Sequence, residues 1–357
     1  MVDISFFGTK PRQLVGLDIS SSSVKLLELA SGDQDTLCVE RYVIEPFSGE
    51  AVVDGNIGDI GAATDGLQRA LRRFGPGVKN VAIALPTSAV FTKKIILPAG
   101  LRELDMEMQV ESEATRVIPF ALDEVNLDFQ VIGPAGSPDE VEVLVAASRK
   151  EQIEDRVGVA EGCGLKVTVV DVESLALEAA FELVAQQLPN AATGKLVALV
   201  DIGAAVMNFM VLRDGQRVYS REQSFGGQQL TKDISRYYGM SLDEAETAKR
   251  SNNMPNDYAK AVLEPFMENL ALEISRAMQF FFTSTQYNEV NYLVLAGGCA
   301  AIPGLADAVG RRTQVKTCIA NPFEAMTVPT KLATKKLMTD APTMMVACGL
   351  ALRRFDE

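Results

Sequence analysis

Two aspartates at the ends of apolar stretches are the first residues that could do chemistry. Asp18 ends the stretch that begins at Leu14, and Asp201 ends the stretch that begins at Leu196. Small residues follow both aspartates: Ser20, Ser21 and Ser22 in the first turn, and Gly203 and Ala204 in the second. Backbone N–H groups of such turns can converge on phosphate, and two carboxylates then require a divalent cation such as Mg²⁺ with its water shell. Either turn alone could instead hold an aspartate that only caps a β-turn.

Glycines mark two further turns. One pair, Gly297 and Gly298, follows an apolar strand, and the other, Gly226 and Gly227, opens a helix. A flat base could lie on the first pair, and helix openings bind anions. The next predicted helix carries Glu246 and Lys249 one turn apart, with Arg250 beside them, so that they could contact a ribose and a purine. An ordinary surface ion pair is the alternative for Glu246 and Lys249.

Composition excludes several classes of function. The chain has 34 Lys and Arg against 47 Asp and Glu, a net charge of −13, without a basic face for nucleic acid. It has no histidine, which excludes Ser/His/Asp and Cys/His catalysis and nearly every zinc site. Its five cysteines form no C-x-x-C pair, as expected of free thiols in a reducing cytosol. The first residues carry an early acid and no long apolar run, so we expect neither export nor membrane insertion.

The 357 residues exceed what one hydrophobic core usually holds, so we expect two α/β domains. Strands and acidic turns recur in the two halves, and an offset of 183 positions aligns Asp18 with Asp201 without a gap. The predicted first domain covers residues 1–190 and includes an inserted α+β subdomain at about 86–150. The second covers residues 191–357 and includes a helical subdomain at about 226–290.

The order of these motifs resembles the actin-like ATPase superfamily. Within it the chain resembles the PilM family of type IV pilus assembly proteins, related to the cell-division protein FtsA. The shared motifs are DISSSSVKLLEL from Asp18, VDIGA from Val200, FGGQQLT from Phe225, AETAK from Ala245 and LAGG from Leu295. Stretches specific to PilM are VIPF from Val117, DEV from Asp123, QFFF from Gln279, ANPF from Ala320 and VACGL from Val346.

The resemblance implies duplicated actin-like (ribonuclease H-like) domains around a cleft that binds ATP and Mg²⁺. Asp18–Ser22 would form the first phosphate loop, Asp201–Ala204 the second, and the Gly297 pair the adenosine turn. Glu246 and Lys249 would lie at the purine and ribose. Asp18 and Asp201 would reach Mg²⁺ through water. Glu173 falls where related chaperone ATPases carry an acid that positions water or metal, which makes it the candidate catalytic residue.

Departures from the superfamily pattern bear on hydrolysis. Ser20 stands where the first phosphate turn usually has glycine, and Ala204 and Ala205 stand where hydroxyl residues are common. Fewer phosphate contacts follow, so we expect ATP binding with weak or no ATPase activity.

The resemblance also implies partners and a location. A groove bordering the insert would take the N-terminal cytoplasmic peptide of PilN, an inner-membrane protein, as an extended segment or an added strand. Other pilus assembly proteins, including the motor ATPases, are further candidate partners, and self-association is open. The chain would then be cytoplasmic and held at the inner membrane through its partner. The alternatives are an FtsA-like filament-forming protein and a small-molecule kinase of the same superfamily.

Overall fold

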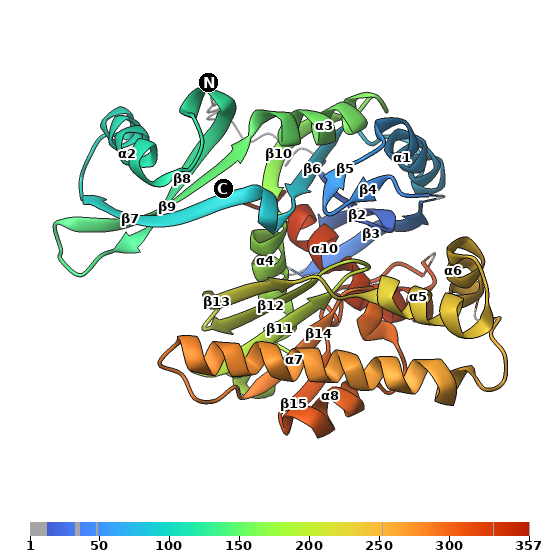
Figure 1. Cartoon of the computed structure of the whole chain (residues 1–357). Helices are drawn as coiled ribbons and strands as arrows, with labels where there is room; N and C mark the ends of the chain where they lie inside the picture. The colour runs from blue at the N-terminus through green and yellow to red at the C-terminus, as the bar shows by residue number, and fades with distance from the viewer. Residues whose placement is uncertain (1–12, 33–35, 48, 252, 331, 357) are drawn as a thin grey trace.

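A computed structural model describes residues 13–356 except 33–35, 48, 252 and 331. Two five-stranded sheets form its framework (Figure 1). The first has the order β10-β6-β1-β2-β3, and the second the order β13-β12-β11-β14-β15. The strands of the first sheet are β1 (Val15–Ile19), β2 (Ser23–Ser31), β3 (Leu37–Pro46), β6 (Asn80–Leu85) and β10 (Lys166–Val172). Those of the second are β11 (Leu196–Ile202), β12 (Met207–Arg213), β13 (Gln216–Gln223), β14 (Tyr292–Ala296) and β15 (Lys316–Ile319).

The two sheets repeat one topology, which confirms the expected duplication. In each, three antiparallel strands are followed by two parallel ones. Asp18 on β1 lies opposite Lys25 on β2, and Asp201 on β11 lies opposite Asn208 on β12. The residues opposite the two aspartates are themselves 183 positions apart in the chain. The offset found in the sequence is therefore also the offset between equivalent positions of the two sheets.

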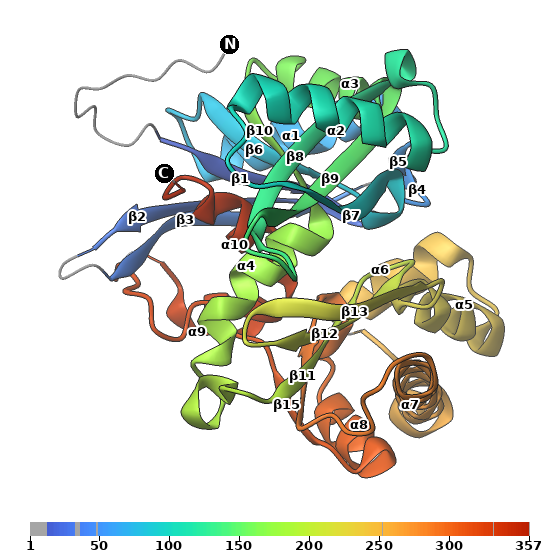
Figure 2. The same ribbon diagram turned by 90° about the vertical axis from the view of Figure 1, so that its left-hand side faces the viewer.

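Helices form three layers around the two sheets (Figure 2). The middle layer is α4 (Glu173–Ala185) and α10 (Met345–Leu352), whose apolar residues share one core with both sheets. The far face of the first sheet packs on α1 (Ile60–Phe74) and α3 (Lys150–Glu161). The far face of the second packs on α7 (Glu264–Ser284) and α8 (Leu305–Thr313). A Cβ atom at Gly349 of α10 would overlap the backbone of Ala176 in α4, so the middle layer depends on that glycine.

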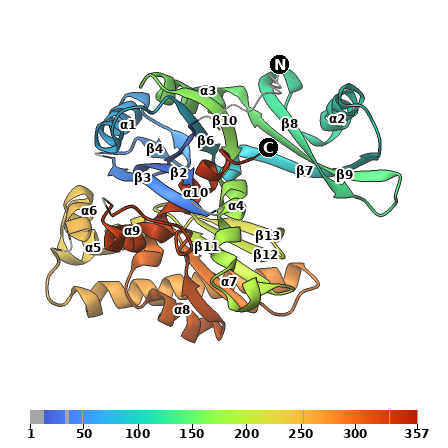
Figure 3. The ribbon, with the colours of Figure 1, turned by 180° about the vertical axis from the view of Figure 1, so that it is seen from behind.

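The insert forms its own sheet, which projects from the first half on the side away from α1 (Figure 3). Its order is β7-β9-β8. Its elements are β7 (Val90–Pro98), α2 (Glu103–Val117), β8 (Val125–Pro134) and β9 (Glu140–Arg149). Met106 and Val110 of α2 pack with Leu97 and Val143 on one face of this sheet. This is the α+β arrangement expected there, and the domain limits given above remain our proposal.

The remaining elements connect these layers. They are β4 (Val52–Val53), β5 (Asn56–Ile57), α5 (Gly227–Tyr238), α6 (Leu242–Ser251), a π-helix (Ala259–Leu263) and α9 (Thr334–Asp340). Short 3-10 turns are Thr87–Ala89, Leu122–Glu124, Pro189–Ala192, Gly298–Ala301 and Ala341–Met344. In the part of the chain that is described, no helix combines the length and apolarity needed to cross a bilayer.

Candidate functional site

The first turn is closed by its own polar groups. Asp18 and Lys25 are only 4% and 6% exposed, and Lys25 Nζ lies 2.6 Å from Asp18 Oδ2. Lys25 also donates to Ser20 Oγ at 2.9 Å, and Ser20 Oγ donates to the carbonyl oxygen of Ser23 at 3.0 Å. Ser21 and Ser22 are half-buried in the same turn. The structure thus places a lysine beside the predicted aspartate and gives the Ser20 hydroxyl a role in closing the turn.

The second turn is built from backbone. The Gly203 N–H donates to Val206 O at 2.9 Å. The start of α5 lies on this turn, because Gly227 N–H donates to Gly203 O at 3.0 Å and Gln228 N–H to Ala204 O at 2.8 Å. A Cβ atom at Gly226 would come within 2.6 Å of the carbonyl oxygens of Gly203 and Ala204. Gly226 therefore allows α5 to begin against the second turn, and the N–H groups of Gly227 and Gln228 hold the turn.

The glycine turn that begins at Gly297 packs against the second turn. Gly297 has φ of 82°, and a Cβ atom there would overlap the backbone of Ile202, next to the second turn. Cys299 Sγ lies 3.7 Å from Gly203 O. Gly298 is different, since a Cβ atom at that position meets nothing within 4 Å. Gly297 is thus required by the backbone, whereas Gly298 leaves open space beside the turn.

A polar cluster ties α6 to the start of α5. Lys249 Nζ lies 2.6 Å from Glu246 Oε2 and 2.7 Å from Thr231 Oγ1, and it also reaches Gly227 O at 3.3 Å. Burial raises the pKa of Glu246, but hydrogen bonds from Lys249 and Thr231 and the charge of Arg250 outweigh it and hold that pKa below its ordinary value. Glu246 and Lys249 do form the i,i+3 ion pair, and this pair is part of the unit around the second turn.

Charges from the two halves meet between the turns. Burial and the charge of Asp18 raise the pKa of Glu173 to about 7, against the opposing charge of Arg156. Burial raises the pKa of Asp201 to about 6, with Lys25 opposing the rise and Asp18 adding to it. The predicted acids Asp18, Asp201 and Glu173 therefore lie close enough to affect one another. In the described part of the chain, no group of three or more His, Cys, Asp or Glu side chains is arranged to hold a metal ion, so these acids do not form a complete metal site by themselves.

Sequence reasoning missed Lys25 and Arg156. Lys25 left a signal, since it is the one cation of β2 and lies between the apolar residues Val24 and Leu26. Arg156 left none, because it lies among other charged residues of α3. Its side chain is nevertheless 3% exposed and donates to Ile19 O at 3.0 Å and to Gly55 O at 2.5 Å. Lys25 thus holds side chains of the first turn, and Arg156 holds its backbone at Ile19.

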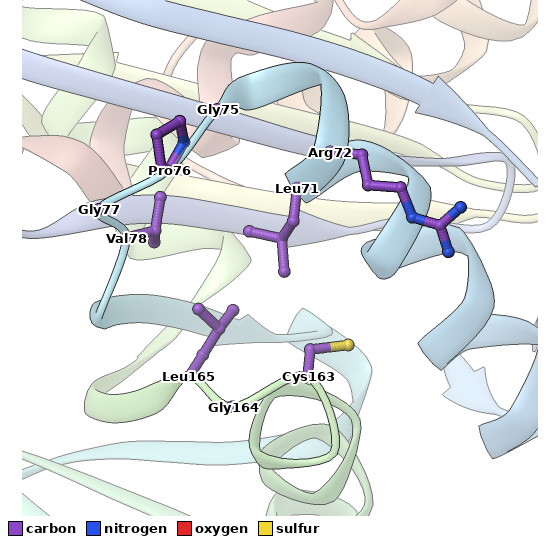
Figure 4. A pocket seen from close by; sticks show the side chains of 9 residues that line it. All are labelled: Leu71, Arg72, Gly75, Pro76, Gly77, Val78, Cys163, Gly164 and Leu165. Atoms are coloured by element: carbon purple, nitrogen blue, oxygen red, sulfur yellow. The ribbon is translucent and has the colours of Figure 1, made fainter.

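A pocket of about 400 Å³ lies elsewhere, between the end of α1 and the turn from α3 to β10 (Figure 4). Figure 4 shows Leu71, Val78, Leu165 and Cys163 around it, while the Arg72 side chain extends away from them. Ligand sites usually combine an apolar wall with a few converging polar groups. This pocket has an apolar wall, but the charged side chain among its lining residues extends away from it, so we place no nucleotide there.

Comparison with known proteins bears on identity. A family model described as "Type IV pilus assembly protein PilM" matches residues 16–355. A chain of a solved PilM–PilN type IV pilus biogenesis complex is 27% identical with a TM-score of 0.80, covering 96% of this chain and 99% of that one. The ethanolamine utilization protein EutJ of Carboxydothermus hydrogenoformans has a TM-score of 0.56 at 16% identity, covering 96% and 90%, and shows the fold alone.

Curated relatives are cell-division proteins FtsA. That of Streptococcus pneumoniae serotype 2 is 26% identical over 260 residues, which are 66% of this chain and 54% of that protein. That of Enterococcus hirae is 24% identical over 343 residues, covering 84% and 76%. The chain thus spans little more than half of the first relative. The family match spans nearly the whole described chain, and so the protein belongs to the PilM family of type IV pilus assembly proteins, with an actin-like fold.

Proposed function

We propose that this chain is an ATP-binding adaptor of the type IV pilus inner-membrane assembly complex, and that it binds the N-terminal cytoplasmic peptide of PilN. The observation that carries the proposal is the likeness, over 96% of the chain, to a chain of a PilM–PilN complex. Binding to PilN would hold the chain at the inner face of the inner membrane and link PilN to other pilus proteins.

The proposed nucleotide site lies between the two acidic turns. Phosphates would lie between Asp18–Ser22 and Asp201–Ala204, with Lys25 as the cation nearest the first turn. A divalent cation bound there would lower the pKa values of Asp201 and Glu173, which burial raises to about 6 and about 7 in its absence, because a bound cation favours the ionised carboxylates. Mg²⁺ would neutralise charge on the phosphate oxygens, and Asp18 and Asp201 would hold its water shell.

The adenosine would lie beside the second turn. Gly298 leaves space there, and Glu246 and Lys249 are already oriented by Thr231. Weak turnover is part of the proposal. Ser20 is engaged in closing the first turn, and Ala204 supplies no hydroxyl to the second, so few side-chain donors are left to stabilise the transition state.

The proposed PilN site borders the insert. Strand β10 is the outer strand of the first sheet, and its Val170 is 41% exposed. The face of the insert sheet opposite α2 carries Ile96 at 60% exposure. Lys94 on the same face is close enough to α4 to lower the pKa of Glu178, against the larger effect of burial. An extended peptide could add to the edge of β10 and place apolar side chains against these residues.

Calorimetric titration of the MgATP-loaded chain with a synthetic PilN peptide tests the adaptor function. We expect saturable one-to-one binding near or below about 10⁻⁶ M, roughly −8 kcal/mol. Val170→Lys should weaken it, because a charge at the β10 edge opposes strand addition. Ile319→Lys is the matched control, since Ile319 is 42% exposed on β15, the equivalent outer strand of the second sheet. No binding by the unaltered chain would exclude the adaptor function.

Binding of MgATP is tested separately with Asp201→Ala, which should weaken it by roughly tenfold or more because a charge-assisted contact is lost. Asp139→Ala, an exposed change in the insert, is the control. Equal affinity in both variants would overturn the assigned site. The FtsA likeness supports a second candidate, a filament-forming protein, which sedimentation with MgATP would reveal.

A further inference from the structure

The insert is connected to the first phosphate turn through a single helix. Strand β9 ends at Arg149 and α3 begins at Lys150, so the sheet of the insert continues into α3 without a loop (Figure 1). Six residues later, about 9 Å along the helix axis, α3 carries Arg156. Any rotation of the insert that includes β9 must therefore move the start of α3 or bend it.

Arg156 joins two backbone segments that are far apart in sequence. Its guanidinium donates to Ile19 O in the first turn at 3.0 Å and to Gly55 O at 2.5 Å. Gly55 is in the tight turn between β4 and β5, where Asp54 and Gly55 both have positive φ. A buried guanidinium with both carbonyls as partners is costly to displace, because its charge would lose these hydrogen bonds without gaining water.

The β4–β5 turn in turn packs on the entry to the insert. A Cβ atom at Gly55 would lie 3.0 Å from the ring of Pro86, the residue before the 3-10 turn that leads into β7. Ser148 at the exit of the insert donates to Ala89 O at the entry, at 3.0 Å. We call residues 86–90 and 148–150 the hinge of the insert. Its two crossings are thus joined to each other and to the turn that Arg156 holds.

A second link runs along the same face of α3. Gln152 Nε2 donates to Asn56 Oδ1 at 3.3 Å, and Gln152 Oε1 lies 3.4 Å from Ser148 Oγ. Gln152 and Arg156 are one helical turn apart, so they contact the β4–β5 hairpin together. The continuous set of contacts therefore runs from Ile19, through Arg156, the hairpin and Gln152, to the hinge.

We propose that Arg156 and Gln152 are positioning residues that couple the first phosphate turn to the hinge of the insert, so that nucleotide binding and binding of the PilN peptide alter each other's affinity. This inference rests on the proposed function. A ligand that fixes the position of Ile19 fixes one partner of Arg156, and a peptide that fixes the insert acts on the hinge. Because such coupling is reciprocal, the nucleotide should change peptide affinity by the same factor as the peptide changes nucleotide affinity.

The test measures the affinity of the full chain for MgATP with and without saturating PilN peptide. We expect a ratio of roughly fivefold or more for the unaltered chain. Gln152→Ala should lower this ratio by about twofold or more, while changing the affinity for MgATP alone by less than about threefold. Arg156→Lys should lower the ratio as well, since one ammonium group cannot reproduce the two directed bonds of a guanidinium. Glu154→Ala, an exposed change on the same helix, should keep the ratio.

A ratio of one in the unaltered chain, or an unchanged ratio in Gln152→Ala, would overturn the coupling while leaving the adaptor function intact. If the unaltered chain does not bind MgATP, or does not bind the PilN peptide, the proposed function itself is wrong. Amide hydrogen exchange of the unliganded chain tests, without either ligand, whether the β4–β5 hairpin and the hinge depend on Arg156. Arg156→Lys should speed exchange by roughly tenfold both at residues 55–57 and at residues 87–90. Faster exchange confined to residues 19–20 would contradict the linkage.

Discussion

The two acidic turns occupy equivalent positions in repeated sheets but are held by different forces. At the first turn, a buried ion pair joins Lys25 to Asp18, and the guanidinium of Arg156 binds the backbone. At the second, Asn208 stands opposite Asp201 where the first half has lysine. There the hydrogen bonds to the turn itself come from the backbone N–H groups of Gly227 and Gln228, with Gly226 allowing close approach. One half thus depends on paired charge and the other on steric fit.

This difference predicts how each half responds to change. A buried ion pair is sensitive to the loss of one partner, because the other charge is left without compensation. A close backbone contact at a glycine is sensitive to an added side chain, which needs space and is strained where φ is positive. It does not depend on charge. Substitutions that act on one force should therefore affect one half far more than the other.

Lys25→Met should have the largest effect on stability. It leaves Asp18 buried without its cation, and the expected loss is about 3–5 kcal/mol in the free energy of unfolding. Urea unfolding at pH 7 measures it. The double variant Asp18→Asn/Lys25→Met removes both charges and should recover part of the loss. If the double variant is as unstable as the sum of the single variants, the ion pair does not hold the first turn.

Gly297→Ala should have the next largest effect. The new methyl group needs a backbone with positive φ and meets the backbone of Ile202, and we expect a loss of about 2–4 kcal/mol. Its neighbour provides the control, because Gly298 has open space for a methyl group, and Gly298→Ala should stay within about 0.5 kcal/mol. Equal melting temperatures of the two variants would show that close packing does not set the second turn.

The stability should also depend on pH, through one buried acid in each half. In the folded chain the pKa of Asp201 is raised to about 6 and that of Glu173 to about 7, against roughly 4 in an unfolded chain. Raised values favour the protonated folded state, so this contribution is full below about pH 4 and is lost as the pH rises through 6 and 7.

Without nucleotide or Mg²⁺, the free energy of unfolding should therefore fall between pH 5 and pH 8, by on the order of 1–3 kcal/mol. Asp201→Asn should reduce this dependence, because the amide cannot ionise, and should leave the part that Glu173 contributes. Asp139→Asn, at an exposed position, should leave it unchanged. Denaturant titrations at several pH values measure the slope, and an unaltered slope in Asp201→Asn would mean that its charge does not oppose folding.

Most of the architecture could be predicted from the sequence. The sequence pattern predicts a strand over Lys166–Val172 and a helix from about Arg102; the structure has that strand, and α2 begins one residue later, at Glu103. Repetition of the acidic turns indicated the duplication because the offset of 183 is constant through strands and turn. The helical spacing of residues 57–74 predicts a helix from Ile57, but α1 begins at Ile60, because Ile57 pairs with Val52 in a two-residue strand too short to leave a pattern.

The site could be predicted only in part. The aspartates and glycines left a signal because a turn needs particular residue types at fixed spacing. Arg156 left none, since its partners are the carbonyl oxygens of Ile19 and Gly55, and a carbonyl is present at every residue. The edge of β10 also could not be identified, because strand order depends on pairing between segments far apart in the chain. The roles of the predicted residues toward ATP remain predictions.

The smallest effect should come from the outer member of the α6 cluster. Arg250 pairs with Glu246 at 2.8 Å, but its side chain is 37% exposed, so Arg250→Ala should cost about 0–1 kcal/mol and leave MgATP affinity within about twofold. Lys249→Ala removes a contact to Thr231 and to the start of α5, and should weaken MgATP binding by about tenfold at similar stability. Calorimetry with MgATP on both variants measures the difference. If the two variants bind equally well, Lys249 is only a surface ion-pair partner, and the second half offers steric fit to the nucleotide without a cation of its own.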